Sequence, residues 1–392
     1  MPPIPYTAAL YLAVIQFLFA STWTIYVIYL PQLLMQAGID SQWLRWILLC
    51  DQLTFIFMDI GLGFAADKVQ RAVGKLGGVI LKFSLVSCVA FLAIPQGLSA
   101  TGLLVLLFIW VISSSALRVP LLVLLGKYTA KPQLPMAIAL QSVGLAVAGS
   151  IAPYLGMYLT TIDPRIPFFI SSITLLLAIS GLVYVEKWLQ RQATTATSTP
   201  SPVLPVPPVM LFIIAYLCAG IGFQVHSAFN GTPQLLQFVS KAELPYLLPI
   251  FWIGFNLLIF PMGLLIKRLG VFPVLIGVSV LAAGCAFFAT IATTLTQLLI
   301  AQFFMGGFWG SMFIAGITAA LNLGKTGKEG MILGLWSSML AMAAFLRIGL
   351  SLSGWQETTE IQTLLPLLPV VFWASVAGLL IIMLRIYRQP AR

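Results

Sequence analysis

Twelve long apolar runs restrict the folds open to this chain more than any other feature of its sequence. They lie at residues 8–35, 43–66, 76–96, 101–128, 134–160, 165–187, 208–238, 244–267, 272–293, 297–322, 329–353 and 362–388. A helix crosses the hydrocarbon core of a bilayer in about 20 apolar residues, whereas a membrane β-strand needs only about 10 residues of alternating polarity. The runs have the helical length, so they predict an all-α membrane protein with twelve transmembrane helices.

The composition excludes a water-soluble protein. Hydrophobic residues make up 60% of the 392 residues and charged residues only 8%, whereas a soluble surface needs roughly 25–35% charged residues. The net charge of +10 does not indicate nucleic-acid binding, because the basic residues are scattered singly. We find no phosphate-binding loop and no His/Glu metal motif in the sequence, so we expect no enzyme, no cofactor and no metal site.

The basic residues favour alternate loops, and this bias predicts the orientation in the membrane. Cytoplasmic loops carry an excess of Lys and Arg. If both termini are cytoplasmic, the outside loops carry only Arg45, Arg165 and Lys241. The inside loops and the C-terminal tail then carry Lys68, Arg71, Lys75, Lys82, Lys127, Lys131, Lys187, Arg191, Lys267, Arg268, Lys325, Lys328, Arg385, Arg388 and Arg392. We therefore expect cytoplasmic termini and, because no Lys or Arg precedes the first run, a retained first span.

One polar segment divides the chain into two parts. Residues 193–202 contain only Ala, Thr, Ser and Pro, and three further prolines follow before residue 209. A Ser/Thr/Pro-rich composition is typical of a flexible linker. We predict an N-terminal six-helix half at 1–190, a cytoplasmic linker at 191–207 and a C-terminal six-helix half at 208–392.

The loop after the second span contains residues of a known family motif. Gly63 is followed by Asp67, Arg71, Gly74 and Lys75. This arrangement resembles the loop 2–3 motif of the major facilitator superfamily, and residues 263–270 form a weaker counterpart at the matching place in the second half. The resemblance covers the whole chain. It implies the major facilitator fold, with two six-helix halves that rock about a central substrate site.

Two branches of that superfamily share further residues with this chain. Asp59 and the motif after it resemble the second span of sugar–cation symporters of the melibiose-permease type. However, Arg118 and Phe55 stand where that branch has acids, which counts against a sodium site. In the fifth span, residues 148–156 resemble the Gly-rich motif of drug–proton antiporters, although small residues there also serve helix packing.

Four ionisable side chains lie inside the apolar runs: Asp51, Asp59, Arg118 and Arg347. Each costs roughly 2.5–3.5 kcal/mol on insertion scales, so each should face a cavity or a partner. At 1.5 Å per residue, Asp59 and Arg118 both lie roughly 12–13 Å from the cytoplasmic end of their spans. We predict that they form an ion pair, which is either structural or opened by substrate or proton.

Two further pairs are candidates for gates. Asp51 and Arg347 lie at matching depth near the outer ends of the second and eleventh spans, which face each other in the resembled fold. We expect them to close an outer gate when the transporter opens inward. Asp67 and Arg71 lie at the cytoplasmic edge, where a carboxylate can meet the positive N-terminal end of a neighbouring helix. The resemblance assigns them to an inner gate.

Polar and aromatic residues in the spans supply the substrate and coupling candidates. His226 is close in sequence to Asn230 and to a Gly and a Pro that could interrupt the seventh span. A histidine titrates near neutral pH, so His226 either takes part in proton coupling or is simply hydrogen-bonded. The other candidates are Trp23, Tyr26, Gln141, Asn256 and Trp309.

Together these features predict a secondary active transporter that moves a small organic solute by alternating access, with proton-coupled uptake favoured. One alternative is a drug or metabolite–proton antiporter, and another is a non-transporting receptor or assembly factor on the same scaffold. We expect a small-molecule substrate, a coupling proton or alternatively sodium, and a monomer in the lipid bilayer. We expect a multi-pass protein of the plasma membrane, most simply a bacterial inner membrane.

Overall fold

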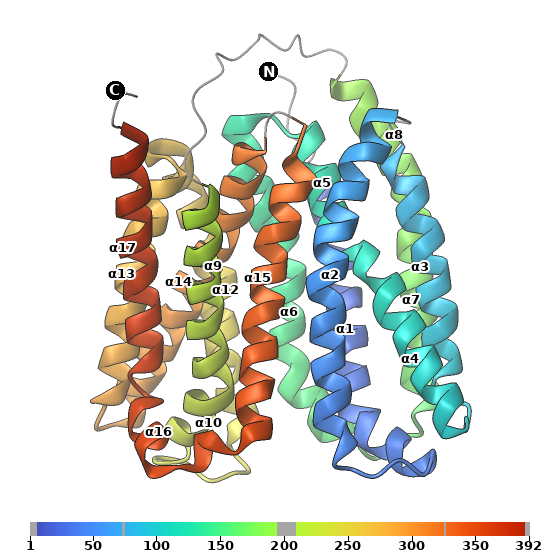
Figure 1. Cartoon of the computed structure of the whole chain (residues 1–392), viewed down its shortest axis with the longest axis horizontal. Coiled ribbons are helices and arrows are strands. Elements are labelled where there is room, and N and C mark those ends of the chain that lie inside the picture. Colours follow the sequence, from blue (N-terminus) through green and yellow to red (C-terminus); the bar gives the residue numbers. More distant parts are fainter. Residues whose placement is uncertain (1–5, 73–74, 194–208, 325–326, 389–392) are drawn as a thin grey trace.

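The computed structural model describes residues 6–72, 75–193, 209–324 and 327–388, and within them it is a bundle of long, roughly parallel helices (Figure 1). Twelve helical segments are long and apolar enough to cross a membrane, and the described residues contain no β-strand. The prediction of an all-α protein with twelve spans is confirmed. From residue 194 on, the predicted linker lies outside the described residues.

The first six spans occupy α1 to α8. Spans four to six each consist of more than one helical segment. The elements are α1 (Tyr6–Gln36), α2 (Trp43–Ala72), α3 (Leu76–Ala93), α4 (Ala100–Ser114), η1 (Ser115–Leu117), α5 (Val119–Tyr128), η2 (Lys131–Gln133), α6 (Leu134–Leu159), α7 (Arg165–Ser180) and α8 (Leu182–Ala193).

The last six spans occupy α9 to α17. The elements are α9 (Val209–Val225), η3 (His226–Asn230), α10 (Gly231–Leu235), α11 (Leu244–Leu247), α12 (Pro249–Leu269), α13 (Val271–Thr290), α14 (Leu295–Leu323), α15 (Glu329–Ser353), η4 (Trp355–Glu357), α16 (Thr359–Leu364) and α17 (Leu368–Arg388). The predicted start of the twelfth span at residue 362 is wrong. Pro366 separates α16 from α17, because proline cannot continue a helix that requires its N–H.

The two ends of the bundle are named here by their connections. The linker end, at the top of Figure 1, is the end at which α8 stops and α9 begins, and the distal end is opposite. Because the spans alternate in direction, α2 reaches the linker end at Ala72, and α15 leaves it at Glu329. The sequence predicts that the linker end is cytoplasmic.

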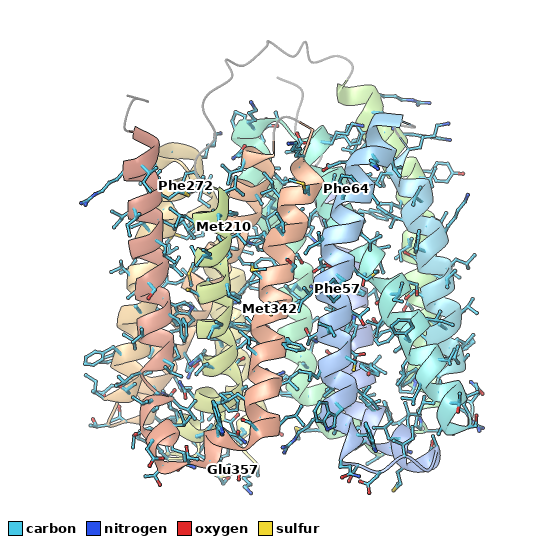
Figure 2. All side chains as sticks on the ribbon, in the orientation of Figure 1. Phe57, Phe64, Met210, Phe272, Met342 and Glu357 are labelled. Carbon is cyan, nitrogen blue, oxygen red and sulfur yellow. The ribbon has the colours of Figure 1, made fainter. Side chains whose placement is uncertain are left out.

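The flanks of the bundle are apolar, as lipid requires. Phe57 and Phe64 on α2 are 63% and 46% exposed, and Met210 on α9 is 69% exposed (Figure 2). In water such a surface would aggregate, whereas in lipid it meets a solvent of its own polarity. The cysteines differ in exposure: Cys88 is buried, but Cys50 is exposed.

Two helix pairs make the largest contacts between the first six spans and the last six: α2 packs on α15 (Figure 1), and α6 packs on α12. Glycines allow the first pair to approach closely. A Cβ added at Gly63 would lie 2.2 Å from the carbonyl oxygen of Gly330, and one added at Gly334 would lie 2.4 Å from that of Asp59. Small residues at a helix interface let the backbones touch in this way. We call this contact the α2–α15 seam.

Candidate functional site

The fourth span is interrupted, and the interruption places Arg118 in the middle of the bundle. Helix α4 ends at Ser114, a 3-10 turn follows, and α5 restarts with Pro120 in its first turn. Arg118 itself has φ −95° and ψ −95°, outside the helical region. Pro120 donates no backbone hydrogen bond and hinders the helical conformation of the residues before it. The local sequence therefore accounts for the break.

Arg118 forms an ion pair with Asp59 of α2, as the sequence predicted. Its Nε lies 3.0 Å from Asp59 Oδ1 and its Nη2 2.8 Å from Oδ2. Asp59 is fully buried, and the Arg118 side chain is 25% exposed. A bidentate guanidinium–carboxylate pair is among the strongest polar contacts in proteins. The geometry confirms the pairing, while its role in transport stays a prediction.

A serine of the other half completes this network. Ser337 of α15 donates from its hydroxyl to Asp59 Oδ2 at 2.7 Å and accepts from Arg118 Nη2 at 3.4 Å. The guanidinium also lies over the ring of Phe55, with its carbon 4.3 Å from the ring centre, a favourable cation–π contact. Asp59, Arg118 and Ser337 are called the charged site below. It crosses the α2–α15 seam.

An aromatic cluster in the first six spans adjoins the charged site through Phe55. Trp23 contacts Tyr26, Phe55 and Trp110 with ring centroids 4.5–5.3 Å apart. Tyr26, Phe55 and Trp110 are at most 2% exposed, so the rings fill one another's space. Trp23 and Tyr26, both predicted as substrate candidates, therefore lie in a packed cluster.

The predicted Asp51–Arg347 pair is not formed in this structure. Asp51 instead accepts a hydrogen bond from the Tyr26 hydroxyl at 2.8 Å. Arg347 has a buried Nε without a hydrogen-bond partner. An outer gate made by Asp51 and Arg347 stays a prediction for another conformation.

Asp67 meets the N-terminus of α15, as the sequence suggested. Its two carboxylate oxygens accept from the backbone N–H groups of Gly330 and Met331 at 2.7 and 2.9 Å. The first N–H groups of a helix have no partner in the helix, and their positive end favours a carboxylate. The contact ties α2 to α15 at the linker end. The side chain of Arg71, its predicted gate partner, lies outside the described residues.

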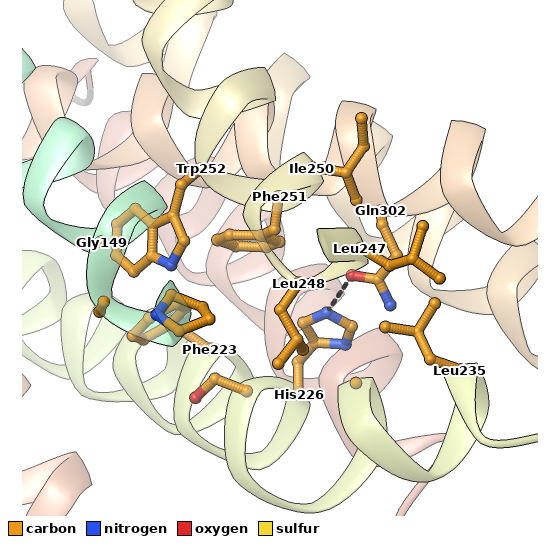
Figure 3. A pocket seen from close by; sticks show the side chains of 14 residues that line it. Gly149, Phe223, His226, Leu235, Leu247, Leu248, Ile250, Phe251, Trp252 and Gln302 are labelled. Atoms are coloured by element: carbon orange, nitrogen blue, oxygen red, sulfur yellow. Dashed lines mark hydrogen bonds between the residues drawn. The ribbon is translucent and has the colours of Figure 1, made fainter. Parts of the chain in front are cut away.

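A cavity of about 220 Å³ lies between α6 and the last six spans. Figure 3 shows the side chains that line it. The cavity is in the distal half of the bundle, because α12 begins there at Pro249 and α6 ends nearby at Leu159. We call it the aromatic cavity. Its lining consists of Gly149, Ala152, Pro153, Phe223, His226, Ser227, Gly231, Leu235, Leu247, Leu248, Ile250, Phe251, Trp252 and Gln302.

His226 lies in this lining because the seventh span contains a π-helical turn. The turn spans His226–Asn230, between α9 and α10. The predicted interruption is thus a local widening, not a break. His226 Nε2 lies 2.9 Å from Gln302 Oε1, and Gln302 donates in turn to Gln234 Oε1 at 3.4 Å. Single π-turns often occur at functional sites. The result is a neutral polar chain along an otherwise apolar wall.

The other predicted site residues lie outside the cavity lining. Asn230 donates to the carbonyl of Leu365 at 2.8 Å and so holds the π-turn against the segment before α17. Trp309 stacks on Phe223 with centroids 4.4 Å apart. Asn256 donates to the Trp252 carbonyl, and its Oδ1 is buried without a partner. These residues surround or support the cavity.

Gln141, the remaining candidate, lies between α1 and α6. Its amide donates to Gln16 Oε1 at 3.3 Å. It is buried, with 4% of its surface exposed. The contact joins two helices of the first six spans, so it is a structural pairing in this conformation.

The sequence analysis did not identify several residues of the two sites. Gln302 and Gln234 could have been noticed as amides inside long apolar runs. Ser337 carries no such signal, because a serine inside a span usually bonds to its own helix.

Glu186, which belongs to neither site, caps helix α3: its carboxylate accepts from Leu76 and Gly77 N–H at 2.8 and 2.9 Å. Within the described residues, no group of three or more His, Cys, Asp or Glu side chains could hold a metal ion.

Comparison with known protein families agrees with the fold and with the family that the loop 2–3 motif resembles. The Major Facilitator Superfamily matches over residues 12–346. The chain therefore belongs to this superfamily of membrane transporters, and it is a multi-pass membrane protein. A sequence comparison with curated proteins finds no significant match.

Several solved structures share the fold. A bacterial homologue of the iron transporter ferroportin, in its outward-facing state, is 12% identical with a TM-score of 0.69, covering 96% of this chain and 99% of that one. The transporter FucP, in the outward conformation, is 14% identical with a TM-score of 0.64 over 99% of both chains. The human organic anion transporter MFSD10 is 12% identical with a TM-score of 0.67, covering 99% and 100%. At these identities the likeness concerns the fold alone.

Proposed function

We propose that this protein is a proton-coupled secondary transporter that takes up a small organic solute by alternating access. The observation that carries the proposal is the charged site, in which Asp59 and Arg118 of the first six spans meet Ser337 of the last six. A buried ion pair is costly to desolvate and is retained where it has a task. Its place on the seam makes the contact sensitive to rocking of the two halves.

In this mechanism Asp59 is the proton acceptor. When Asp59 is ionised, it holds Arg118 through two hydrogen bonds and accepts a third from Ser337. A proton on the carboxyl removes the charge that orients Arg118. The α2–α15 seam then loses its central polar contact and opens more easily. Loss of the proton on the other side restores the ion pair and the seam.

A drug or metabolite–proton antiporter is the second candidate. The observation in its favour is that Ala152 and Pro153, from the span-five motif, line the aromatic cavity. A cavity with this lining suits lipophilic solutes better than sugars. Symport and antiport share the same scaffold and the same proton site, so they differ in the direction of the linked solute flux.

Proton flux in proteoliposomes tests the proposal. The purified protein is reconstituted with a pH-sensitive dye inside, and sugars, organic anions, lipophilic cations and neutral aromatic molecules are added in turn. A solute-dependent acidification indicates symport, and alkalinisation indicates antiport. Asp59→Asn should abolish the pH change while solute still binds. If no class of solute moves protons through a folded protein, proton-coupled transport is wrong, and the non-transporting receptor becomes the better interpretation.

The proposed setting is the plasma membrane, most simply a bacterial inner membrane, with the protein working as a monomer. Size-exclusion chromatography with light scattering on the detergent-solubilised chain would test the monomer.

A further inference from the structure

The walls of the aromatic cavity suit a flat, uncharged molecule. The ring of Trp252 stands at 81° to that of Phe251 and at 77° to that of Phe223, with centroids 5.7 and 6.2 Å apart. Rings at right angles offer a guest ring both a face and an edge, which are the arrangements that aromatic pairs prefer. None of the fourteen lining residues, all of them described, is Asp, Glu, Lys or Arg. A charged ligand would lose its hydration there without a counterion.

One polar atom in this lining has a hydrogen-bonding capacity that the protein leaves unused. The amide nitrogen of Gln302 donates to Gln234, so the Gln302 oxygen faces His226 and accepts from its Nε2–H. A neutral imidazole with the proton on Nε2 presents Nδ1 as an acceptor. No described residue donates to that atom, and His226 is only 4% exposed. The unused acceptor calls for a ligand with an N–H or O–H group.

A glycine leaves the cavity wall beside His226 without a side chain. Gly231, in the lining, follows the π-turn, and a Cβ there would lie 3.4 Å from the carbonyl oxygen of His226. The cavity volume of about 220 Å³ is below the roughly 300–1,000 Å³ that is usual for drug-sized ligands. A single or fused pair of aromatic rings is therefore the appropriate size.

The cavity also lies across the boundary between the two halves. Gly149, Ala152 and Pro153 come from α6, and all other lining residues come from the last six spans. A Cβ at Gly149 would lie 2.5 Å from the Trp252 ring, so the two halves touch at the cavity wall. Rocking of the halves must change the shape of the cavity, as alternating access requires.

We infer that the aromatic cavity is a binding site for an uncharged aromatic molecule of one or two rings that donates a hydrogen bond to His226 Nδ1. This deepens the transport function proposed above, on which it rests, by naming the substrate class. Indole and its derivatives are suitable probes of this chemistry, because the same ring system exists with and without the donor group and with charge of either sign.

The test is a calorimetric titration of the full chain in lipid nanodiscs with four probes. Indole has the donor, 1-methylindole lacks it, tryptamine is a cation and indole-3-acetate is an anion. We expect indole to bind at least about tenfold more tightly than each of the other three, since one hydrogen bond or one uncompensated charge is worth that much or more. Empty nanodiscs give the background from partition into lipid.

Two variants assign the binding to the cavity. His226→Phe keeps the ring but removes the acceptor, so indole should bind it no better than 1-methylindole binds the unaltered protein. Ala152→Phe fills the cavity and should abolish indole binding. Gly156→Phe is the matched control, because it adds the same bulk one turn further along α6, where nothing lies within 4 Å of an added Cβ. Thermal unfolding confirms that each variant is folded.

Several results would overturn the inference: no indole binding above the lipid background, equal affinity for 1-methylindole or for a charged probe, binding retained in Ala152→Phe, or binding lost in Gly156→Phe. The transport proposal fails separately. Indole that binds through His226 but moves neither itself nor protons in proteoliposomes contradicts transport and leaves the site assignment intact. Proton-coupled flux of another solute without indole binding contradicts the site alone.

Discussion

The charged site and the aromatic cavity lie at two different contacts between the first six and the last six spans, and they use opposite chemistry. At the charged site, Asp59 and Arg118 satisfy one another, and aromatic rings fill the neighbouring space. At the aromatic cavity, rings leave an opening, and the polar groups of His226 and Gln302 are neutral. The first arrangement is closed, and we propose that it responds to protons. The second is open, and we infer that it accepts a guest.

The comparison indicates how one fold can separate coupling from recognition. A charge in a span is expensive unless it is paired, so a charged group is a poor lining for a site that must empty and refill. A neutral amide–imidazole chain keeps its internal hydrogen bonds whether or not a ligand is present. Both sites include residues from the two halves, which is how binding at one can influence the other.

The largest effect that we predict comes from breaking the ion pair. Arg118→Gln leaves Asp59 buried without a counterion and should destabilise the protein by about 3–5 kcal/mol. The double variant Asp59→Asn/Arg118→Gln should regain a large part of that loss, because it removes the unpaired charge. Both are measured by denaturant unfolding in detergent. Additive losses in the double variant would show that the two side chains do not stabilise each other.

Substitutions in the α2–α15 seam should also destabilise the folded protein, for a steric reason. Gly63→Leu places a side chain against the backbone of Gly330 and should destabilise the folded protein by about 1–3 kcal/mol. Gly61→Leu is the control, because nothing lies within 4 Å of a Cβ there. Thermal stability and solute flux are the measurements. Equal behaviour of the two variants would mean that the seam is not packed as described.

Two helix caps allow the boundary between the halves to be compared with the interior of one half. Asp67→Ala removes the cap on α15 across the seam, and Glu186→Ala removes the cap on α3 within the first six spans. Each should cost about 0.5–2 kcal/mol, typical of a lost cap. Only Asp67→Ala should also change the opening of the linker end, as measured by electron–electron distances between spin labels on α2 and α15. A change of equal size in Glu186→Ala would contradict this assignment.

The smallest effect should come from the neutral chain at the cavity. Gln302→Leu removes the partner of His226 and should destabilise the protein by only about 1 kcal/mol, the usual worth of one neutral hydrogen bond. The measurement is the unfolding titration used for Arg118→Gln. A loss as large as that of Arg118→Gln would remove the contrast between the two sites.

Much of the charged site could be predicted from the sequence, whereas the cavity could not. Asp59 and Arg118 stand out because few charges occur in apolar runs, and counting residues along two helices places them at one depth. Asp67 follows from the same reasoning, because a carboxylate at a helix edge favours a neighbouring N-terminus. The Asp51–Arg347 pair is not formed in this structure, where Tyr26 reaches Asp51 instead. Equal depth does not fix the direction in which a side chain points.

The sequence by itself determined that the chain folds in lipid and not in water, how many spans it has, and which residues need a partner when they are buried. These follow from apolar length and the cost of charge in lipid, which depend on local composition alone. Only the tertiary structure decided which partner each group meets and where space remains. Phe223, Phe251 and Trp252 look like ordinary core residues in the sequence. They form a cavity with Gln302 because helices far apart in the chain meet at particular angles and rotations. Those are set by the packing of all the spans together.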